Sequence, residues 1–262
     1  EASEIGAVNT IVRDGERLIG HNTDYAGFRA LLCENGVAVR GANCLVLGSG
    51  GASKTVQCVL RDLGAAKVTV VSRSGDVNYT NASQQQDAEI LVNTTPIGMY
   101  PNNGQAPLYP GSFTRLQWAV DVIYNPLRTN LLCQANKAGM ETVGGLGMLI
   151  GQGIAAAELF LGRAIPQTIG AKIEKDMLLE KENIVLIGMP GVGKTTVGME
   201  IADRMGREFY DIDQMIVYDD GREIPQIFAE EGEAYFRQLE QKIVLSLANV
   251  TGAVIACGGG VV

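Results

Sequence analysis

Residues 188–195 read Gly188-Met-Pro-Gly-Val-Gly-Lys-Thr195, a complete G-x-x-x-x-G-K-[ST] phosphate-binding loop. The loop follows an apolar run at 184–187 and precedes a helical pattern at 197–205. In this strand–loop–helix order the glycines turn backbone N–H groups inward around phosphate. The alternative is a glycine-rich turn without a ligand, and the flanking pattern favours the phosphate site. We therefore predict that this part of the chain binds a nucleoside triphosphate.

The side chains of the loop predict how the triphosphate is held. Lys194 is placed to meet the β- and γ-phosphates, and the hydroxyl of Thr195 can ligate Mg²⁺. The predicted nucleotide-binding residues are Gly191, Val192, Gly193, Lys194, Thr195 and Thr196.

The composition bounds the class of protein. The chain has 262 residues, 46% hydrophobic and 19% charged, which is enough for two packed domains. A net charge of −8 argues against general binding to nucleic acid or to anionic membranes. No apolar run is long enough for a membrane span. Five scattered cysteines without a C-x-x-C pair indicate reduced thiols, so we expect a cytoplasmic protein. The only histidine, His21, is assigned no role.

Short apolar runs alternate with helical patterns along the whole chain, one of them at 151–161, which predicts an α/β fold. The pattern weakens in a charged stretch and then resumes at Ile184. We predict a first domain at 1–170, a linker at 171–182 and a second domain at 183–262. The oligomeric state is not predicted.

A second glycine loop, Gly48-Ser-Gly-Gly-Ala-Ser53, follows the predicted strand 42–47 and opens a predicted helix. Only two glycines of G-x-G-x-x-G are in register, but a full βαβ unit at 42–72 supports a dinucleotide site. Arg73 stands at the position where an NAD site carries an acidic residue. Its guanidinium suits the 2′-phosphate of NADP. The alternative is that Arg73 is a solvated turn residue. The predicted residues here are Gly48, Ser49, Gly50, Gly51, Ala52, Ser53, Ser72 and Arg73.

Five motifs in the first domain resemble those of shikimate dehydrogenases and occur in the same order, over nearly all of residues 1–165. They are Gly6-Ala-Val-Asn-Thr10, Asn22-Thr-Asp24 with Gly27-Phe28, Gly48–Ser53, Asn93-Thr-Thr-Pro-Ile-Gly98 and Gly145-Leu-Gly-Met-Leu-Ile-Gly-Gln152. The resemblance implies a Rossmann-like domain and NADPH-dependent reduction of 3-dehydroshikimate to shikimate. The residues themselves leave open that the domain prefers quinate or uses NAD.

The resemblance also implies residue roles in this domain. Asn9, Asp24 and Gln152 would bind the substrate hydroxyls, with Tyr124 lining the site and Asp24 forming a catalytic dyad with a lysine. Val122 and Gly145 would border the nicotinamide. On the sequence alone, Asp24 or Thr23 could instead cap the helix 25–33, and Gln152 could be satisfied within its own helix.

The second domain resembles shikimate kinases over 183–262. The phosphate loop is followed by Asp211-Ile-Asp213, by Gly232-Glu-Ala-Tyr-Phe-Arg237 and by Gly258-Gly-Gly260. The resemblance implies a P-loop kinase α/β domain that uses ATP and Mg²⁺ to phosphorylate shikimate. Nucleoside-monophosphate kinases share the phosphate loop but not these later motifs.

This second resemblance implies roles for the later motifs. Lys194 would neutralise phosphate charge, with Asp211 near the metal on Thr195. Asp213 would hold the shikimate hydroxyls and assist the attacking one, and Arg237 would pair with the substrate carboxylate. Gly258, Gly259 and Gly260 would let the backbone approach the ring. The open alternatives are a solvated strand end at 211–213, a surface ion pair between Arg237 and Glu240, and a plain glycine turn.

Both resemblances extend beyond the ends of the chain. The dehydrogenases carry their catalytic lysine before the motif at 6–10, and Lys54 in the cofactor loop does not replace it. The kinases carry a lid with arginines after the triple glycine. We therefore expect nucleotide binding with weak or no turnover from this exact chain, which would be the interior of a bifunctional enzyme. A catalytically incompetent module that binds NADP and ATP is the alternative.

Overall fold

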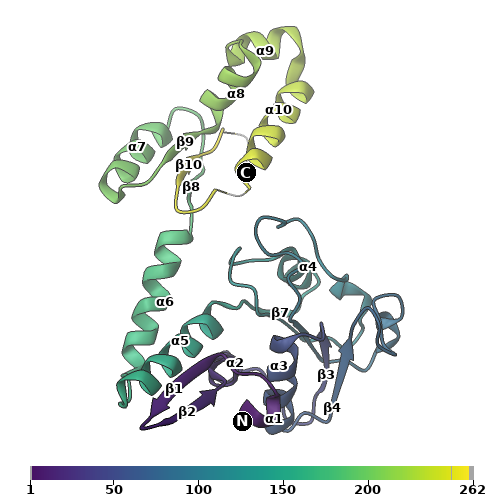
Figure 1. Ribbon diagram of the computed structural model, residues 1–262. Helices are drawn as coiled ribbons and strands as arrows, with labels where there is room; N and C mark the ends of the chain where they lie inside the picture. The colour runs from purple at the N-terminus through teal and green to yellow at the C-terminus, as the bar shows by residue number, and fades with distance from the viewer. Residues whose placement is uncertain (1, 249, 260–262) are drawn as a thin grey trace. The chain divides into compact units, whose positions relative to one another are not determined.

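The computed structural model describes residues 2–248 and 250–259. The chain forms two compact units, residues 1–174 and 175–262 (Figure 1). Helix α6 (Gln167–Lys181) crosses the boundary, so the segment predicted as a linker is mostly helical. No helix in the described residues is long and apolar enough to cross a membrane.

The first unit is built on a five-stranded parallel sheet in the order β4-β3-β5-β6-β7. β3 lies between β4 and β5, so the strand order reverses beside it, and ligands of such sheets bind at the carboxyl ends next to this reversal. The predicted α/β organisation is confirmed. The strands are β3 (Asn43–Leu47), β4 (Lys67–Val71), β5 (Ile90–Asn93), β6 (Trp118–Asp121) and β7 (Glu141–Val143).

Both faces of this sheet are covered, which explains why its strands read as continuous apolar runs. Along β3, Val46 packs in the cluster that contains α2 (Thr23–Glu34) and α3 (Gly51–Asp62). Leu45 packs in the opposite cluster with α4 (Asn130–Lys137). Two short 3₁₀ helices, η1 (Ala82–Gln84) and η2 (Pro110–Ser112), lie in the connections.

The remaining elements of the first unit come from both ends of its sequence. They are α1 (Ala2–Ile5), the antiparallel hairpin of β1 (Thr10–Asp14) and β2 (Arg17–His21), and helix α5 (Leu146–Leu161). Helices α2 and α5 cross so closely that Gly27 lies against the backbone of α5: a Cβ there would be 2.6 Å from the Met148 carbonyl oxygen. This crossing brings the start of the unit against residues more than a hundred positions later.

We predict that Gly27→Ala lowers the free energy of unfolding of this unit by about 2–3 kcal/mol, because the added Cβ must push the two helices apart. The matched control is Gly153→Ala on α5, where a Cβ meets nothing within 4 Å. It is expected to stabilise by about 0.5–1 kcal/mol through helix propensity. Trp118, the only tryptophan, lies in this unit's sheet, so its fluorescence during urea unfolding reports the change. Equal effects of the two substitutions would contradict the close crossing.

The second unit has a three-stranded parallel sheet in the order β8-β10-β9. Its central strand is fully buried, and β8 carries the phosphate loop at its carboxyl end. Helices α8, α9 and α10 share one apolar cluster with β10. The elements are β8 (Ile184–Leu186), α7 (Lys194–Met205), β9 (Phe209–Asp211), α8 (Ile212–Asp220), α9 (Ile224–Glu230), α10 (Gly232–Ser246) and β10 (Val254–Ala256).

Candidate functional sites

The first glycine loop joins β3 to α3 at the strand reversal. Gly48 has φ +105°, and a Cβ there would lie 2.7 Å from the Thr94 hydroxyl, so the turn requires glycine. The buried Ser53, which stands where the third glycine of the motif is expected, donates a 2.6 Å hydrogen bond to the Gly48 carbonyl and closes the loop. Gly50 and Gly51 are exposed at the start of α3 with open space around them. The loop therefore presents an accessible helix N-terminus to a ligand.

The neighbouring strand end carries Ser72 and Arg73. Gly48 N–H donates to the Val71 carbonyl at 2.8 Å, so the end of β4 lies directly beside the glycine loop. Ser72 N–H bonds the Val77 carbonyl at 3.1 Å and holds the turn that follows β4. Arg73 lies in this turn and is exposed. The structure thus brings an exposed arginine to the edge of the expected dinucleotide site.

Val122 and Gly145 meet in the same unit. A Cβ on Gly145 would lie 2.1 Å from the Val122 carbonyl oxygen, and Gly145 N–H donates to the Ile123 carbonyl at 3.0 Å. Gly145 is also the N-cap of α5, so this helix begins earlier than the predicted start at Gly151. Tyr124 follows Ile123 in the same loop and is 40% exposed, so its ring is accessible to a ligand.

The predicted substrate residues surround Thr23. The Asn9 side-chain oxygen accepts from Thr23 N–H at 2.9 Å, and the Thr23 hydroxyl donates to Gln152 Oε1 at 3.5 Å. Asp24 is half-buried, and this burial raises the pKa of its carboxyl, while a hydrogen bond from Asn9 opposes the rise. The alternative that Asp24 or Thr23 caps this helix is not the one adopted, because the N-cap is Asn22, whose oxygen accepts from Tyr25 N–H at 3.2 Å. Asp24 is therefore free of a capping role.

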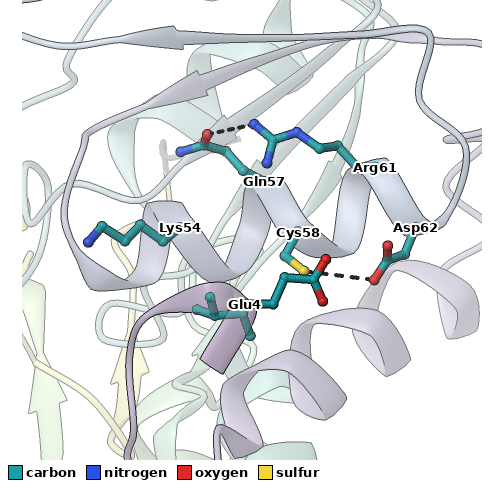
Figure 2. Close-up of a pocket in the computed structure, with 7 residues that line it drawn as sticks. Glu4, Lys54, Gln57, Cys58, Arg61 and Asp62 are labelled. Carbon is teal, nitrogen blue, oxygen red and sulfur yellow. Dashed lines mark hydrogen bonds between the residues drawn. The ribbon is translucent and has the colours of Figure 1, made fainter. Parts of the chain in front are cut away.

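Lys54 lies in a different place from these residues. Figure 2 shows it on α3 beside a pocket of about 290 Å³, to which α1 contributes Glu4. Here Arg61 donates to Gln57 at 3.1 Å, and the Cys58 thiol contacts Asp62 at 3.8 Å. None of the predicted site residues lines this pocket, so we assign it no catalytic role. Its lining residues are Glu4, Ile5, Lys54, Gln57, Cys58, Arg61 and Asp62.

The phosphate loop of the second unit has the geometry that its sequence predicts. Gly188, Gly191 and Gly193 all have positive φ, which glycine adopts without strain. The Lys194 ammonium folds back over the loop and donates to the carbonyl oxygens of Gly188 at 2.7 Å and Met189 at 2.9 Å. Thr196 is exposed on the first turn of α7. Lysine, loop backbone and helix N-terminus therefore converge on one spot.

Thr195 and Asp211 supply two neighbouring oxygen donors. The Thr195 hydroxyl donates to Asp211 Oδ2 at 2.7 Å, and the other oxygen of this buried carboxylate accepts from Gln214 N–H at 3.2 Å as the N-cap of α8. This hard oxygen pair fits Mg²⁺, which takes one or two protein oxygens and completes its shell with phosphate and water. Within residues 2–248 and 250–259, no group of three or more His, Cys, Asp or Glu could hold a metal by itself.

Asp213 and Glu240 both face Gly258. A Cβ on Gly258 would lie 2.8 Å from Asp213 Oδ1 and 2.9 Å from Glu240 Oε1, so a side chain at this position would have to displace both carboxylates. Burial raises the pKa of Asp213, as do the charges of Asp211 and Glu240, while Lys194 opposes the rise. Glu240 is only 8% exposed, and its Oε1 has no hydrogen-bond partner among the described residues. An unpaired buried acceptor can accept a hydrogen bond from water or from a ligand hydroxyl.

The sequence pattern offered Glu240 only as one half of a surface pair. The structure places Glu240 on the buried face of α10, in the helical series of Phe236, Leu239 and Ile243. The sequence did contain a signal for this: Glu240 is an acidic residue at a position where the helical spacing of apolar residues predicts a buried side chain.

Arg237 makes the ion pair that the sequence allowed. Its guanidinium bonds Glu240 Oε2 at 2.8 Å and Glu233 Oε1 at 3.2 Å, with the Phe236 ring 5.5 Å away. The pair with Glu240 is not an ordinary surface contact, because Glu240 is buried. Gly259 packs on Pro190 of the phosphate loop, where a Cβ would come within 2.5 Å. Gly260 lies outside the described residues.

These observations define an α/β protein in which a Rossmann-like unit with a glycine loop precedes a unit with a phosphate-binding loop. The comparisons with known proteins agree. A family model described as "Shikimate kinase" matches residues 190–262. The shikimate dehydrogenase (NADP(+)) of Clostridium perfringens strain 13 is 35% identical over 190 residues, covering 68% of this chain and 70% of that protein. The chain belongs to the shikimate dehydrogenase family, and it continues into a shikimate kinase region as a fusion.

Solved structures support the same assignment for the first unit. Shikimate dehydrogenase 1 from Peptoclostridium difficile has a TM-score of 0.63 and 36% identity, covering 69% of this chain and 70% of that one. The enzyme from Thermus thermophilus, solved in complex with NADP(H) and shikimate, has a TM-score of 0.59 and 32% identity, covering 67% and 70%. The predicted family of the first domain is confirmed.

Proposed function

We propose that this chain carries the sites of two consecutive reactions: NADPH-dependent reduction of 3-dehydroshikimate to shikimate, and ATP-dependent phosphorylation of shikimate. The observation that carries the proposal is that, in the second unit, Asp213 and the unpaired oxygen of Glu240 both face Gly258, while Lys194 is close enough to Asp213 for its charge to oppose the rise that burial causes in the pKa of that carboxyl. A phosphate loop beside carboxylates that can accept from hydroxyl groups suits a polyhydroxylated acceptor. The first unit belongs to the family of dehydrogenases that act on the same compound.

In the first unit, the residues at the sheet's carboxyl edge divide into cofactor and substrate groups. Gly48–Ser53 would hold the pyrophosphate at the N-terminus of α3, and Arg73 would pair with the 2′-phosphate. NADPH, when bound, supplies the hydride. Asn9, Asp24 and Gln152 would orient the substrate hydroxyls, since their side chains are already gathered around Thr23 by hydrogen bonds. Tyr124 would line the site from the loop that follows β6.

In the second unit, charge neutralisation and positioning carry the reaction. ATP, when bound, supplies the phosphoryl group. Lys194 would exchange its two backbone carbonyl acceptors for phosphate oxygens, and Thr195 with Asp211 would hold Mg²⁺. Asp213 would accept the proton of the attacking hydroxyl. Arg237 would bind the substrate carboxylate, and Glu240 would hold its guanidinium in place while accepting from a hydroxyl.

The test is a one-pot reaction of the chain with 3-dehydroshikimate, NADPH and Mg·ATP. Because only weak turnover is expected from this chain, we expect the absorbance of the reduced cofactor to fall slowly and a small amount of a product heavier than shikimate by one phosphate to form. Omitting NADPH should remove both signals, and supplying shikimate directly should restore the second. Phosphorylation of a nucleoside monophosphate but not of shikimate would overturn the kinase assignment. Reduction with NADH but not NADPH would overturn the cofactor assignment.

Arg237→Ala is expected to raise the KM for shikimate in the kinase reaction about 10- to 100-fold, since a charge-assisted pair with the carboxylate is worth about 1.5–3 kcal/mol. NADP⁺ reduction with shikimate, measured on the same sample, should not change. Arg204→Ala, which removes an exposed ion pair with Glu200, serves as the matched control and should alter neither KM. A parallel loss of both activities in Arg237→Ala would indicate misfolding rather than a lost substrate contact.

A further inference from the structure

Asn93 and Asp121 are polar side chains at the centre of the sheet's carboxyl edge, and both are fully buried. They stand opposite each other in register at the ends of β5 and β6. Buried carboxylates are costly unless fully hydrogen-bonded, so this pair requires a reason for its presence. None of the roles described above uses either side chain.

The two oxygens of Asp121 bind three separate segments. Oδ1 accepts from Asn93 Nδ2 at 3.1 Å and from Ile123 N–H at 3.0 Å. Oδ2 accepts from the Thr129 hydroxyl at 2.7 Å, and Thr129 is the N-cap of α4. The carboxylate therefore ties the end of β5, the turn after β6 and the start of α4 to one point.

The network continues from Asn93 into the loop that borders the glycine turn. Asn93 Oδ1 accepts from Thr95 N–H at 3.0 Å and from the Thr95 hydroxyl at 2.7 Å. Thr94 N–H donates to the Leu47 carbonyl at 2.9 Å, and its hydroxyl crowds Gly48.

The network also reaches the other side of the site, because the Ile123 carbonyl accepts from Gly145 N–H at 3.0 Å. Asp121 holds the N–H of this same Ile123. Val122, which lies between Asp121 and Ile123 in the chain, has its carbonyl against Gly145. Asp121 thus precedes Val122 in the chain and binds the N–H of Ile123, and these are the two residues that contact Gly145.

We propose that Asp121 is a positioning residue that fixes the nicotinamide end of the dinucleotide site by holding the loop 93–95 beside Gly48 and the loop 122–123 against Gly145. The inference rests on the proposed NADP(H)-binding function and adds a residue to it. It assigns no effect to the adenosine end, where Ser72 and Arg73 follow β4 at the opposite side of the glycine loop.

The network requires a carboxylate and not an amide. The Thr129 hydroxyl donates to Asp121, and its oxygen also accepts from Leu132 N–H at 3.4 Å. An asparagine at 121 would turn an N–H₂ group either toward this hydroxyl or toward the two N–H donors on the other side. In the second orientation a donor faces two donors. In the first, the Thr129 hydroxyl must accept from the amide and turn its own proton away, so the charge-assisted bond that anchors the start of α4 is lost.

The test compares two ligands on the Asp121→Asn variant of the full chain. NADPH carries the nicotinamide, whereas 2′,5′-ADP carries adenosine with its 2′- and 5′-phosphates but no nicotinamide. We expect the Kd for NADPH to rise about 10-fold and the Kd for 2′,5′-ADP to stay within about 2-fold of wild type. Asp14→Asn, a change at an exposed hairpin residue, is the matched control and should alter neither.

The outcomes separate positioning from mere stability. Equal weakening of both ligands, or no weakening of either, would overturn the proposal. If Asp121→Asn fails to fold by Trp118 fluorescence, Thr129→Val and Thr129→Ser decide the question. Valine removes the donor to Asp121 and should weaken NADPH alone, while serine keeps the hydroxyl and should restore wild-type binding. Wild-type protein that binds neither ligand would contradict the proposed function itself, and so differs from failure of this inference.

Discussion

Replacing Lys194 with alanine is expected to weaken Mg·ATP binding about 100-fold and to leave NADPH binding unchanged, since charge-assisted bonds of the lost kind are worth about 3 kcal/mol. The ammonium already lies over the phosphate loop, where it makes two hydrogen bonds to the backbone carbonyls of Gly188 and Met189. On binding it would exchange these neutral acceptors for phosphate oxygens. Isothermal titration with a non-hydrolysable ATP analogue measures the change.

Lys175→Ala is the matched control for this substitution, because Lys175 is an exposed lysine of the same unit. It removes the same charge from the unit without touching the phosphate loop. Because salt screens exposed charges, the Kd for the ATP analogue should stay within about 2-fold of wild type. Equal losses in the two variants would show that net charge, and not the placement of the Lys194 ammonium, governs nucleotide affinity. No loss in Lys194→Ala would contradict the nucleotide site.

The second large effect is expected at Arg73. Arg73→Ala should raise the Kd for NADPH about 30- to 100-fold and leave the Kd for NADH unchanged, because the guanidinium would contact only the 2′-phosphate. Arg73 is exposed on the turn after β4, beside the glycine loop, so its removal disturbs no packed residue. Fluorescence titration with each cofactor measures the two constants.

Arg61→Ala provides the comparison for Arg73, since Arg61 is exposed on α3, where it donates a hydrogen bond to the neighbouring Gln57. Its effect on either cofactor should be small. If Arg73→Ala weakens NADPH and NADH equally, the arginine acts on the common part of the dinucleotide and the 2′-phosphate assignment is wrong. If wild type binds NADH as tightly as NADPH, the preference for NADP is wrong.

Sequence patterns predicted the parts of the fold that have a short-range physical signal. The phosphate loop between a strand and a helix, the βαβ unit around the first glycine loop and the α/β alternation all follow from local pattern. Helix starts were less predictable. Helix α5 begins at Leu146 and not at Gly151. The sequence missed this early start because glycine is a poor helix former, whereas in the structure the glycines of α5 allow close packing against α2.

The sequence supplied candidate site residues but not the contacts between them. Asp211 was placed near the metal, and the structure shows its direct hydrogen bond from Thr195. Thr23 and Asp24 were the alternatives for the cap of α2, but the cap is Asn22, since three adjacent polar residues can each begin a helix. The closeness of Glu240 to Gly258 depends on how α10 packs against β10, which no local pattern encodes.

The buried network of Asp121 shows the same limit. Asp121 lies in an apolar run that predicts a strand, and its spacing from Asn93 and Thr129 gives no hint of contact. Only the register of β5 against β6 brings the two strand ends together. Tertiary pairing, rather than sequence distance, therefore decides which polar residues at the carboxyl edge support the cofactor loops.

The most direct test of the two-site proposal is a sequential titration of one protein sample. NADPH is added to saturation and is followed by a non-hydrolysable ATP analogue with Mg²⁺, with heat recorded for both. We predict one equivalent of each nucleotide per chain, with the second titration unaffected by the first, because each site is built from residues of its own unit. Mutual displacement, or saturation with one nucleotide only, would contradict the claim that this chain holds both a dehydrogenase cofactor site and a kinase nucleotide site.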